Sequence, residues 1–166
     1  MGRKTQVIMK IKNLFNLLPL RIAYAHCDIP CGIYDPHMAQ VAAHTIIRMT
    51  QLLSDIKNTD LKSQHDISRM THVKEEHAQI LEEELETLRN DYFKDEHYKT
   101  YSNLSDLFNN TLKSISKARQ NIDLTAAQEV LNGVLEISEI FYKSKNVTPV
   151  RVKSVYPTGG EVVVYK

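Results

Sequence analysis

Residues 35–56 read DPHMAQVAAHTIIRMTQLLSDI and decide the fold of this chain. Apolar side chains recur from Met38 to Ile56 at spacings of three and four residues, which places them along one stripe of an α-helix. Asp35 followed by Pro36 is typical of a helix start, with Asp as the N-cap and Pro at the first helical position. The stretch therefore predicts an amphipathic helix that ends near Asp55.

Three more apolar stripes follow at helical spacing after a polar break at residues 57–60. They run from Ile67 to Leu88, from Leu104 to Ala118, and from Ala127 to Phe141. Four amphipathic helices with short connections are typical of an antiparallel bundle. We therefore expect an all-α, up-and-down four-helix bundle.

The ends of these helices carry local signals. Residues 91–94 close the second helix, and Thr125 with Gln128 fits a capping box at the start of the fourth. The tail, residues 147–166, is different, because valines flank the turn-forming stretch at residues 157–160. We expect a short C-terminal extension that can form a β-hairpin, which either packs on the bundle or stays mobile because an isolated hairpin is marginal in water.

Composition limits the function classes. The 166 residues suit one domain, and 21 Lys and Arg against 20 Asp and Glu provide no net field for nucleic acid or acidic lipid.

Residues 1–25 run from basic to apolar and end in Ala23-Tyr24-Ala25, which is typical of a cleavable leader. The apolar run is too short and interrupted for a stable membrane span. We expect a cytoplasmic protein with a pro-segment, or an exported one if residues 1–25 are a signal peptide.

Two cysteines, Cys27 and Cys31, lie in the stretch HCDIPCGIYDP at residues 26–36. A disulfide between residues so close would stabilise the fold little, so metal or redox chemistry is the better interpretation, with a simple disulfide turn as the alternative. Cleavage before His26 would free an α-amine. That amine, the Cys27 amide nitrogen and the two thiolates then form a square of two nitrogens and two sulfurs, with the His26 imidazole as an axial donor. Such a tetragonal set favours Ni(II) or Cu(II).

The pattern His-Cys-x-x-Pro-Cys-Gly-x-Tyr followed by Asp-Pro resembles the nickel-containing superoxide dismutase family. The stretches at residues 71–76, 91–94 and 108–113 resemble it too, so the likeness covers about residues 26–145. The resemblance implies a right-handed bundle assembled as a homohexamer, matured by a peptidase, with one nickel ion per subunit after residues 1–25 are removed. It also implies conversion of superoxide to dioxygen and hydrogen peroxide by Ni(II)/Ni(III) cycling. Residues 26–146 would form one domain. It would consist of the bundle and of the metal-binding segment at residues 26–31, which we call the hook.

The same resemblance assigns roles to single residues. His26, Cys27 and Cys31 would be the nickel ligands. Around them, Asp28 would brace the hook, Tyr34 and Tyr92 would line the approach to the metal, and Lys94 would attract the anionic substrate. The sequence departs from the family at Ala42 and His77, where some members pair a Glu with an Arg behind the axial His.

Two other classes of protein fit parts of the sequence. A nickel- or copper-binding helical module without turnover would share the hook but would not consume superoxide. A helical interaction protein with a thiol switch at Cys27 and Cys31 would need neither metal nor cleavage. The N-terminal residue of the natural protein separates them, since only the metal-binding classes require a chain that starts at His26.

Overall fold

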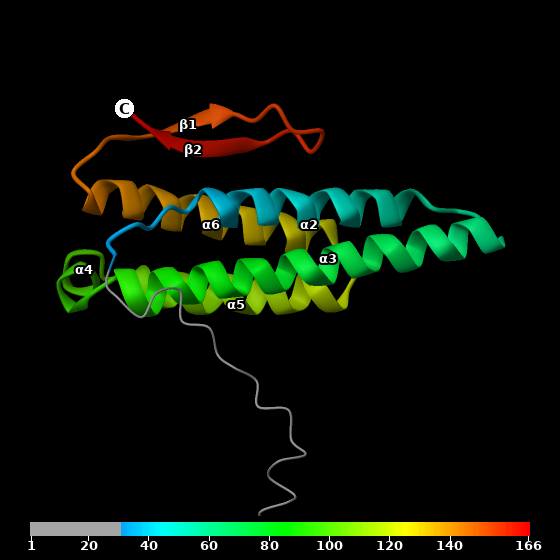
Figure 1. The fold of residues 1–166 in the computed structure, drawn as a ribbon, viewed down its shortest axis with the longest axis horizontal. Coiled ribbons are helices and arrows are strands. Elements are labelled where there is room, and N and C mark those ends of the chain that lie inside the picture. The colour runs from blue at the N-terminus through cyan, green and yellow to red at the C-terminus, as the bar shows by residue number, and fades with distance from the viewer. Residues whose placement is uncertain (1–30) are drawn as a thin grey trace, which may run out of the picture. The chain divides into compact units, whose positions relative to one another are not determined.

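The computed structural model describes residues 31–166, and Gly32–Lys166 forms one compact unit. Four long helices pack together, as the sequence predicts, and a two-stranded sheet lies against them (Figure 1). The long helices are α2 (His37–Asp55), α3 (Leu61–Thr87), α5 (Leu104–Gln120) and α6 (Leu124–Ser144). The bundle is thus confirmed, with the predicted hairpin as its C-terminal extension.

Two short helical segments connect α3 to α5. A π-helical turn, η1 (Leu88–Tyr92), continues α3, and the Phe93 N–H closes it by donating to the Leu88 carbonyl at 2.9 Å. The segment α4 (Asp95–Thr100) follows, in a stretch that the sequence pattern left as a polar connection. At the end of the second long helix, Phe93 is buried and Lys94 is exposed.

The core lies between the apolar faces of the four helices, and α6 contributes most to it. Its side chains are buried on several faces because α2, α5 and both strands all pack against it. The buried face of α2 includes Ala39, Ala42 and Ala43, whose small side chains let the helix lie close to its neighbours. This packing sets the position of the first turn of α2, which directly follows the predicted hook.

The helix starts differ slightly from prediction. Helix α2 begins at His37, one residue late, but the Asp35 carboxylate still accepts a hydrogen bond from the His37 N–H at 2.7 Å. The capping box at Thr125 is wrong. Helix α6 begins at Leu124, and the Asp123 carboxylate accepts from the Ala126 N–H at 3.1 Å. An aspartate at the N-cap satisfies a first-turn amide at least as well as a threonine, so the helix starts two residues earlier than the capping box predicts.

The C-terminal sheet pairs β1 (Pro149–Lys153) with β2 (Glu161–Tyr165) in antiparallel register. It is attached to α2 by side chains of that helix. The Gln40 amide donates to the Val163 carbonyl at 3.1 Å and accepts from the Val163 N–H at 2.6 Å, while His44 Nε2 lies 3.0 Å from the Glu161 carbonyl. The hairpin is therefore a fixed part of the fold. Among the described residues, no helix is long and apolar enough to cross a membrane.

Candidate functional site

The predicted nickel ligands lie at the start of the chain. His26 and Cys27, together with Asp28, fall outside the described residues, and Cys31 is exposed. Gly32 follows with a φ of +72°, a left-handed conformation that glycine adopts without strain. Within residues 31–166, no group of three or more His, Cys, Asp or Glu is placed to hold a metal ion.

The donor set of the hook fits nickel chemically. Two cysteine thiolates are soft donors, and an amine with an amide nitrogen completes a set that suits a tetragonal d-block ion. The exposure of Cys31 leaves its sulfur accessible from solvent. Carboxylate or carbonyl oxygens, which suit magnesium and calcium, play no part in the predicted set.

The structure brings Tyr34 and Tyr92 together. Their ring centroids lie 5.4 Å apart at an interplanar angle of 53°, with Tyr34 just before α2 and Tyr92 at the end of η1. The Tyr92 ring centroid also lies 4.6 Å from that of Phe141 and 5.6 Å from that of His97. The Tyr92 and His97 rings are stacked, with an interplanar angle of 15°. We call Tyr34, Tyr92, His97 and Phe141 the tyrosine cluster. It lies at the end of the bundle where α2 begins and η1 ends.

The tyrosine cluster has polar partners that the sequence did not single out. Ser144 Oγ lies 2.6 Å from the Tyr92 hydroxyl, and Lys145 Nζ lies 4.7 Å above the Tyr92 ring. Burial raises the pKa of Tyr92 above 10, and the hydrogen bond with Ser144 opposes that shift. Tyr92 is therefore a protonated phenol at neutral pH, able to donate a hydrogen bond.

Bundle topology is the signal that could have identified Ser144 and Lys145. In an up-and-down bundle the start of the first helix, the end of the second and the end of the fourth all lie at one end. Residues at the last turn of α6 must therefore face Tyr34 and Tyr92. The spacing of apolar residues alone does not show which of those end residues point inward.

Lys94 occupies a different place from the tyrosines. It is the N-cap residue of α4, where its backbone N–H donates to His97 Nδ1 at 2.9 Å and its side chain is exposed. Through His97, the backbone of Lys94 is tied to the tyrosine cluster. The ammonium group stays in solvent, where it contributes a positive charge without a fixed contact to the phenol.

Ala42 and His77 are the two positions at which the sequence departs from the pattern expected behind the axial ligand. Ala42 is fully buried, and His77 is half-buried with Nδ1 2.9 Å from the Val73 carbonyl of its own helix. A carbonyl only accepts, so Nδ1 carries the proton, and Nε2 is the nitrogen that could approach another group.

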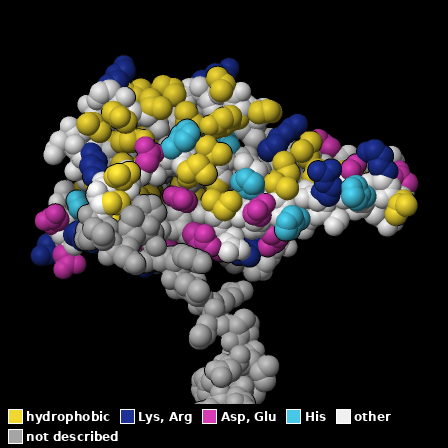
Figure 2. Space-filling model, viewed as in Figure 1, with side chains coloured by type: hydrophobic (Ala, Val, Ile, Leu, Met, Phe, Trp, Pro, Cys, Tyr) yellow, Lys and Arg dark blue, Asp and Glu magenta, His cyan; other side chains and the backbone are white. Residues whose placement is uncertain are grey.

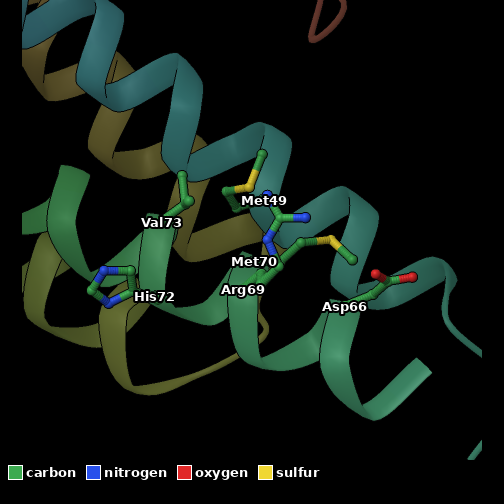
Figure 3. A pocket seen from close by; sticks show the side chains of 6 residues that line it. All are labelled: Met49, Asp66, Arg69, Met70, His72 and Val73. Carbon is green, nitrogen blue, oxygen red and sulfur yellow. The ribbon is translucent and has the colours of Figure 1, made fainter. Parts of the chain in front are cut away.

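A second concave region lies far from the tyrosine cluster. A pocket of about 450 Å³ lies between α2 and α3. Figure 3 shows the side chains of Met49 and Met70 beside each other in it. The remaining lining residues are Asp66, Arg69, His72 and Val73. Val73 lies 19 residues before Tyr92 on a nearly continuous helix, a separation of roughly 25 to 30 Å at the helical rise. This pocket is therefore distinct from the site that contains Tyr92.

Comparison with known proteins relates most of the chain to one family. The family model described as nickel-containing superoxide dismutase matches residues 21–145. Superoxide dismutase [Ni] from Streptomyces seoulensis is 35% identical over 121 residues, which is 73% of this chain and 88% of that protein. The protein of the same description from Streptomyces coelicolor matches with the same identity and coverage.

Solved structures show the same likeness. A native nickel superoxide dismutase is 34% identical, with a TM-score of 0.65, and the match covers 72% of this chain and 99% of that one. A nickel-containing superoxide dismutase in the oxidised state is also 34% identical, with a TM-score of 0.66 and coverage of 73% and 99%. The hook segment lies inside the range that the family model matches, whereas the hairpin lies outside it.

Proposed function

Because the chain belongs to the nickel-containing superoxide dismutase family and dismutates superoxide, we propose that it does so with nickel held by His26, Cys27 and Cys31. Removal of residues 1–25 by a maturation peptidase would free the His26 amine. The ligand set would then be that amine, the Cys27 amide and the two thiolates, with the His26 imidazole as axial donor. We propose one nickel ion per subunit.

The observation that carries this proposal is the family match, which begins at residue 21 and spans the whole hook and the bundle. A helical interaction protein with a thiol switch would require neither. The contact between Tyr34 and Tyr92 supports the same assignment, because it places two phenols at the bundle end that the hook adjoins in sequence.

When bound, the nickel ion supplies one-electron redox chemistry by alternating between Ni(II) and Ni(III). The chain's own residues would select the substrate and supply hydrogen bonds. Lys145 places positive charge beside the tyrosine cluster and Lys94 carries an exposed positive charge, and both charges favour the approach of a small anion. Tyr34 and Tyr92 restrict access to small molecules, and the protonated Tyr92 hydroxyl can donate a hydrogen bond to an incoming oxygen species. Asp28 would brace the hook from within it.

We further propose that the mature chains form a homohexamer in the cytoplasm. Exposed apolar side chains, including Leu61 at 82% and Ile122 at 57%, offer surface for contacts between copies. Two thiolates that must stay reduced to bind metal suit a reducing compartment. The interrupted apolar run of residues 1–25 supports a pro-segment rather than a signal peptide.

The test compares chains that begin at His26 and at Met1. We expect the chain that begins at His26 to bind one equivalent of nickel and to consume superoxide, and the chain that begins at Met1 to do neither. Cys31→Ser in the cleaved chain should abolish activity while circular dichroism shows intact helices. Nickel content by mass spectrometry and superoxide decay by pulse radiolysis are the measurements. An active Cys31→Ser enzyme would refute the ligand set, and nickel binding without superoxide decay would show a metal-binding module instead.

A further inference from the structure

Helix α4 has no buried residue and no apolar stripe. Its charged side chains are exposed, and Figure 2 shows charged side chains of both signs where Figure 1 places this helix. Burial of large apolar side chains therefore does not explain why the helix lies against the bundle. Its two half-buried residues, His97 and Tyr98, are the ones whose rings contact Phe93 of the core.

The His97 ring is nearly parallel to the ring of Tyr92. The two centroids lie 5.6 Å apart with an interplanar angle of 15°, which is an offset stack. The rings of Tyr34 and Phe141 also contact Tyr92, but they are tilted to it by 53° and 48°. The ring of Phe93 meets Tyr92 at 76°. Among the ring contacts of Tyr92 within residues 31–166, the stack on His97 is thus the one that follows the plane of the phenol.

The backbone of Lys94 holds the His97 ring in this orientation. The Lys94 N–H donates to His97 Nδ1 at 2.9 Å, and the His97 N–H donates back to the Lys94 carbonyl at 2.8 Å. Because a backbone N–H can only donate, Nδ1 is the acceptor, and the proton of the neutral ring is on Nε2. The same bond satisfies the N-cap amide of α4 from the third helical position, as in a capping box. His97 therefore has two contacts, the cap bond and the stack on Tyr92.

The plane of the Tyr92 ring matters for its hydroxyl. A phenol O–H lies close to the plane of its ring, because an oxygen lone pair conjugates with the ring. Ser144 Oγ fixes the position of the Tyr92 oxygen at 2.6 Å, but the ring can still rotate about the axis from Cβ to that oxygen. A parallel neighbour opposes this rotation, since turning the phenol would bring its edge against the imidazole. His97 thus controls a degree of freedom that Ser144 leaves open.

We propose that His97 is a positioning residue for superoxide dismutation. Its ring, held by the Lys94 backbone, sets the plane of the Tyr92 ring and with it the direction of the phenol O–H. This role rests on the one proposed above for Tyr92 at the approach to the nickel ion. The competing role for His97 is structural, in which the side chain only caps α4.

Two substitutions separate the two contacts. His97→Asn can place its amide oxygen near the position of Nδ1 and still accept from the Lys94 N–H, but it removes the ring. His97→Phe keeps a ring and removes the acceptor. The matched control is His65→Asn, at an exposed histidine of α3. If α4 is lost in His97→Asn, His97→Gln repeats the test with a usual capping-box residue.

The first measurement is kcat/KM for superoxide, by pulse radiolysis of the mature, nickel-loaded protein at equal nickel content. We expect His97→Asn to lower it by about three- to tenfold, because a hydrogen-bonding group in the site is misoriented. His97→Phe should fall between His97→Asn and wild type, and His65→Asn should equal wild type. In a chain that carries Tyr92→Phe, His97→Asn should have little further effect, since the hydroxyl that it orients is gone.

The second measurement does not depend on nickel. In the full chain that begins at Met1, NMR relaxation of ¹³C-labelled tyrosine rings gives the ring-flip rate of Tyr92, whose signals are those absent from Tyr92→Phe. We expect His97→Asn to raise this rate by about tenfold, on the microsecond to millisecond timescale that such relaxation detects. Hydrogen exchange at the Lys94 amide should stay as slow as in wild type, which shows that α4 is still capped.

Three results would overturn the proposed role. A wild-type kcat/KM in His97→Asn would show that the plane of Tyr92 does not affect the reaction. An unchanged ring-flip rate would show that His97 only caps α4. An equal loss of activity in the Tyr92→Phe chain would show that His97 acts by another route. Failure of the proposed nickel site would appear instead as a wild-type chain without bound nickel, and the ring-flip rate would then decide between the two roles of His97.

Discussion

The Tyr92 hydroxyl lies 2.6 Å from Ser144 Oγ and joins the end of α3 to the last turn of α6. Ser144 Oγ in turn donates to the Phe141 carbonyl at 2.6 Å. Because the serine proton is used in that bond, Tyr92 is the donor and Ser144 the acceptor. The phenol that faces Tyr34 is therefore held by a fixed chain of hydrogen bonds and stays protonated.

We expect Tyr92→Phe to lower kcat/KM for superoxide by about tenfold, because it removes a hydrogen-bond donor from the site. Ser144→Ala should lower it less, since the phenol remains but loses its fixed orientation. Pulse radiolysis of variants with equal nickel content is the measurement. Since burial places the pKa of Tyr92 above 10, its ionisation should not change wild-type activity between about pH 7 and pH 9. Full activity of Tyr92→Phe would remove this residue from the mechanism.

Lys145→Gln should reduce the rate at low ionic strength. Its ammonium group lies 4.7 Å above the Tyr92 ring, so its charge acts on an anion that approaches the tyrosine cluster. We expect a loss of about two- to fivefold at low salt that disappears at high salt, as for other steering charges. The control is Lys153→Gln, which removes an exposed charge from the hairpin instead. An equal effect of the two substitutions would mean that only net charge matters.

The fold could be predicted from the sequence because the apolar stripes are long and regular. The stripe of α2 ends at Asp55, as predicted, and the antiparallel arrangement follows from short connections. The wrong prediction for the start of α6 has a local cause, because two residues there can each cap the helix. At the start of α6, Asp123 and Thr125 are both capable N-caps two residues apart, and the spacing of apolar residues does not decide between them. The short α4 lacks an apolar stripe of its own and so was not predicted.

The candidate site could be predicted only in part. The hook and Tyr34 are close together in the sequence, so the spacing of these residues alone indicates a metal site. Ser144 and Lys145 are more than 50 residues from Tyr92 in the chain, and their contact depends on how far each helix continues past the core. The attachment of the hairpin through Gln40 is similar, because a glutamine on a helix gives no sign that it will bind a strand 123 residues later.

Gly133→Ala should destabilise the bundle. A Cβ at this position would overlap Thr111 Oγ1 of the neighbouring helix and lie 3.0 Å from its Cγ2 atom. Overpacking of this kind costs about 1 to 3 kcal/mol. Chemical denaturation measures the free energy of unfolding, and Thr111→Ala in the same chain should restore part of the loss by removing the overlapping atoms. If Gly133→Ala were as stable as wild type, α5 and α6 would have to lie further apart than the structure shows.

His44 should make the attachment of the hairpin sensitive to acid. Its Nε2 donates to the Glu161 carbonyl at 3.0 Å, and its Nδ1 lies 2.8 Å from Thr158 Oγ1. Burial lowers the pKa of His44, with the bond to the Glu161 carbonyl opposing the shift, so the neutral ring is favoured in the folded chain. Arg48 and His44 both line a cavity of about 230 Å³.

The direction of the pH dependence follows from that lowered pKa. An unfolded histidine has a pKa near 6.5 and takes up a proton more readily than the folded His44. The stability that His44 contributes is therefore complete above about pH 6.5 and is lost as the pH falls from there through the folded pKa. We expect wild type to lose more unfolding free energy than His44→Gln between about pH 8 and pH 5. The matched control is His65→Gln, an exposed histidine of α3, which should keep the wild-type dependence. Urea denaturation at each pH, with hydrogen exchange at the Val163 amide to follow the hairpin itself, makes the comparison. Equal pH dependence of wild type and His44→Gln would show that His44 does not couple the hairpin to pH.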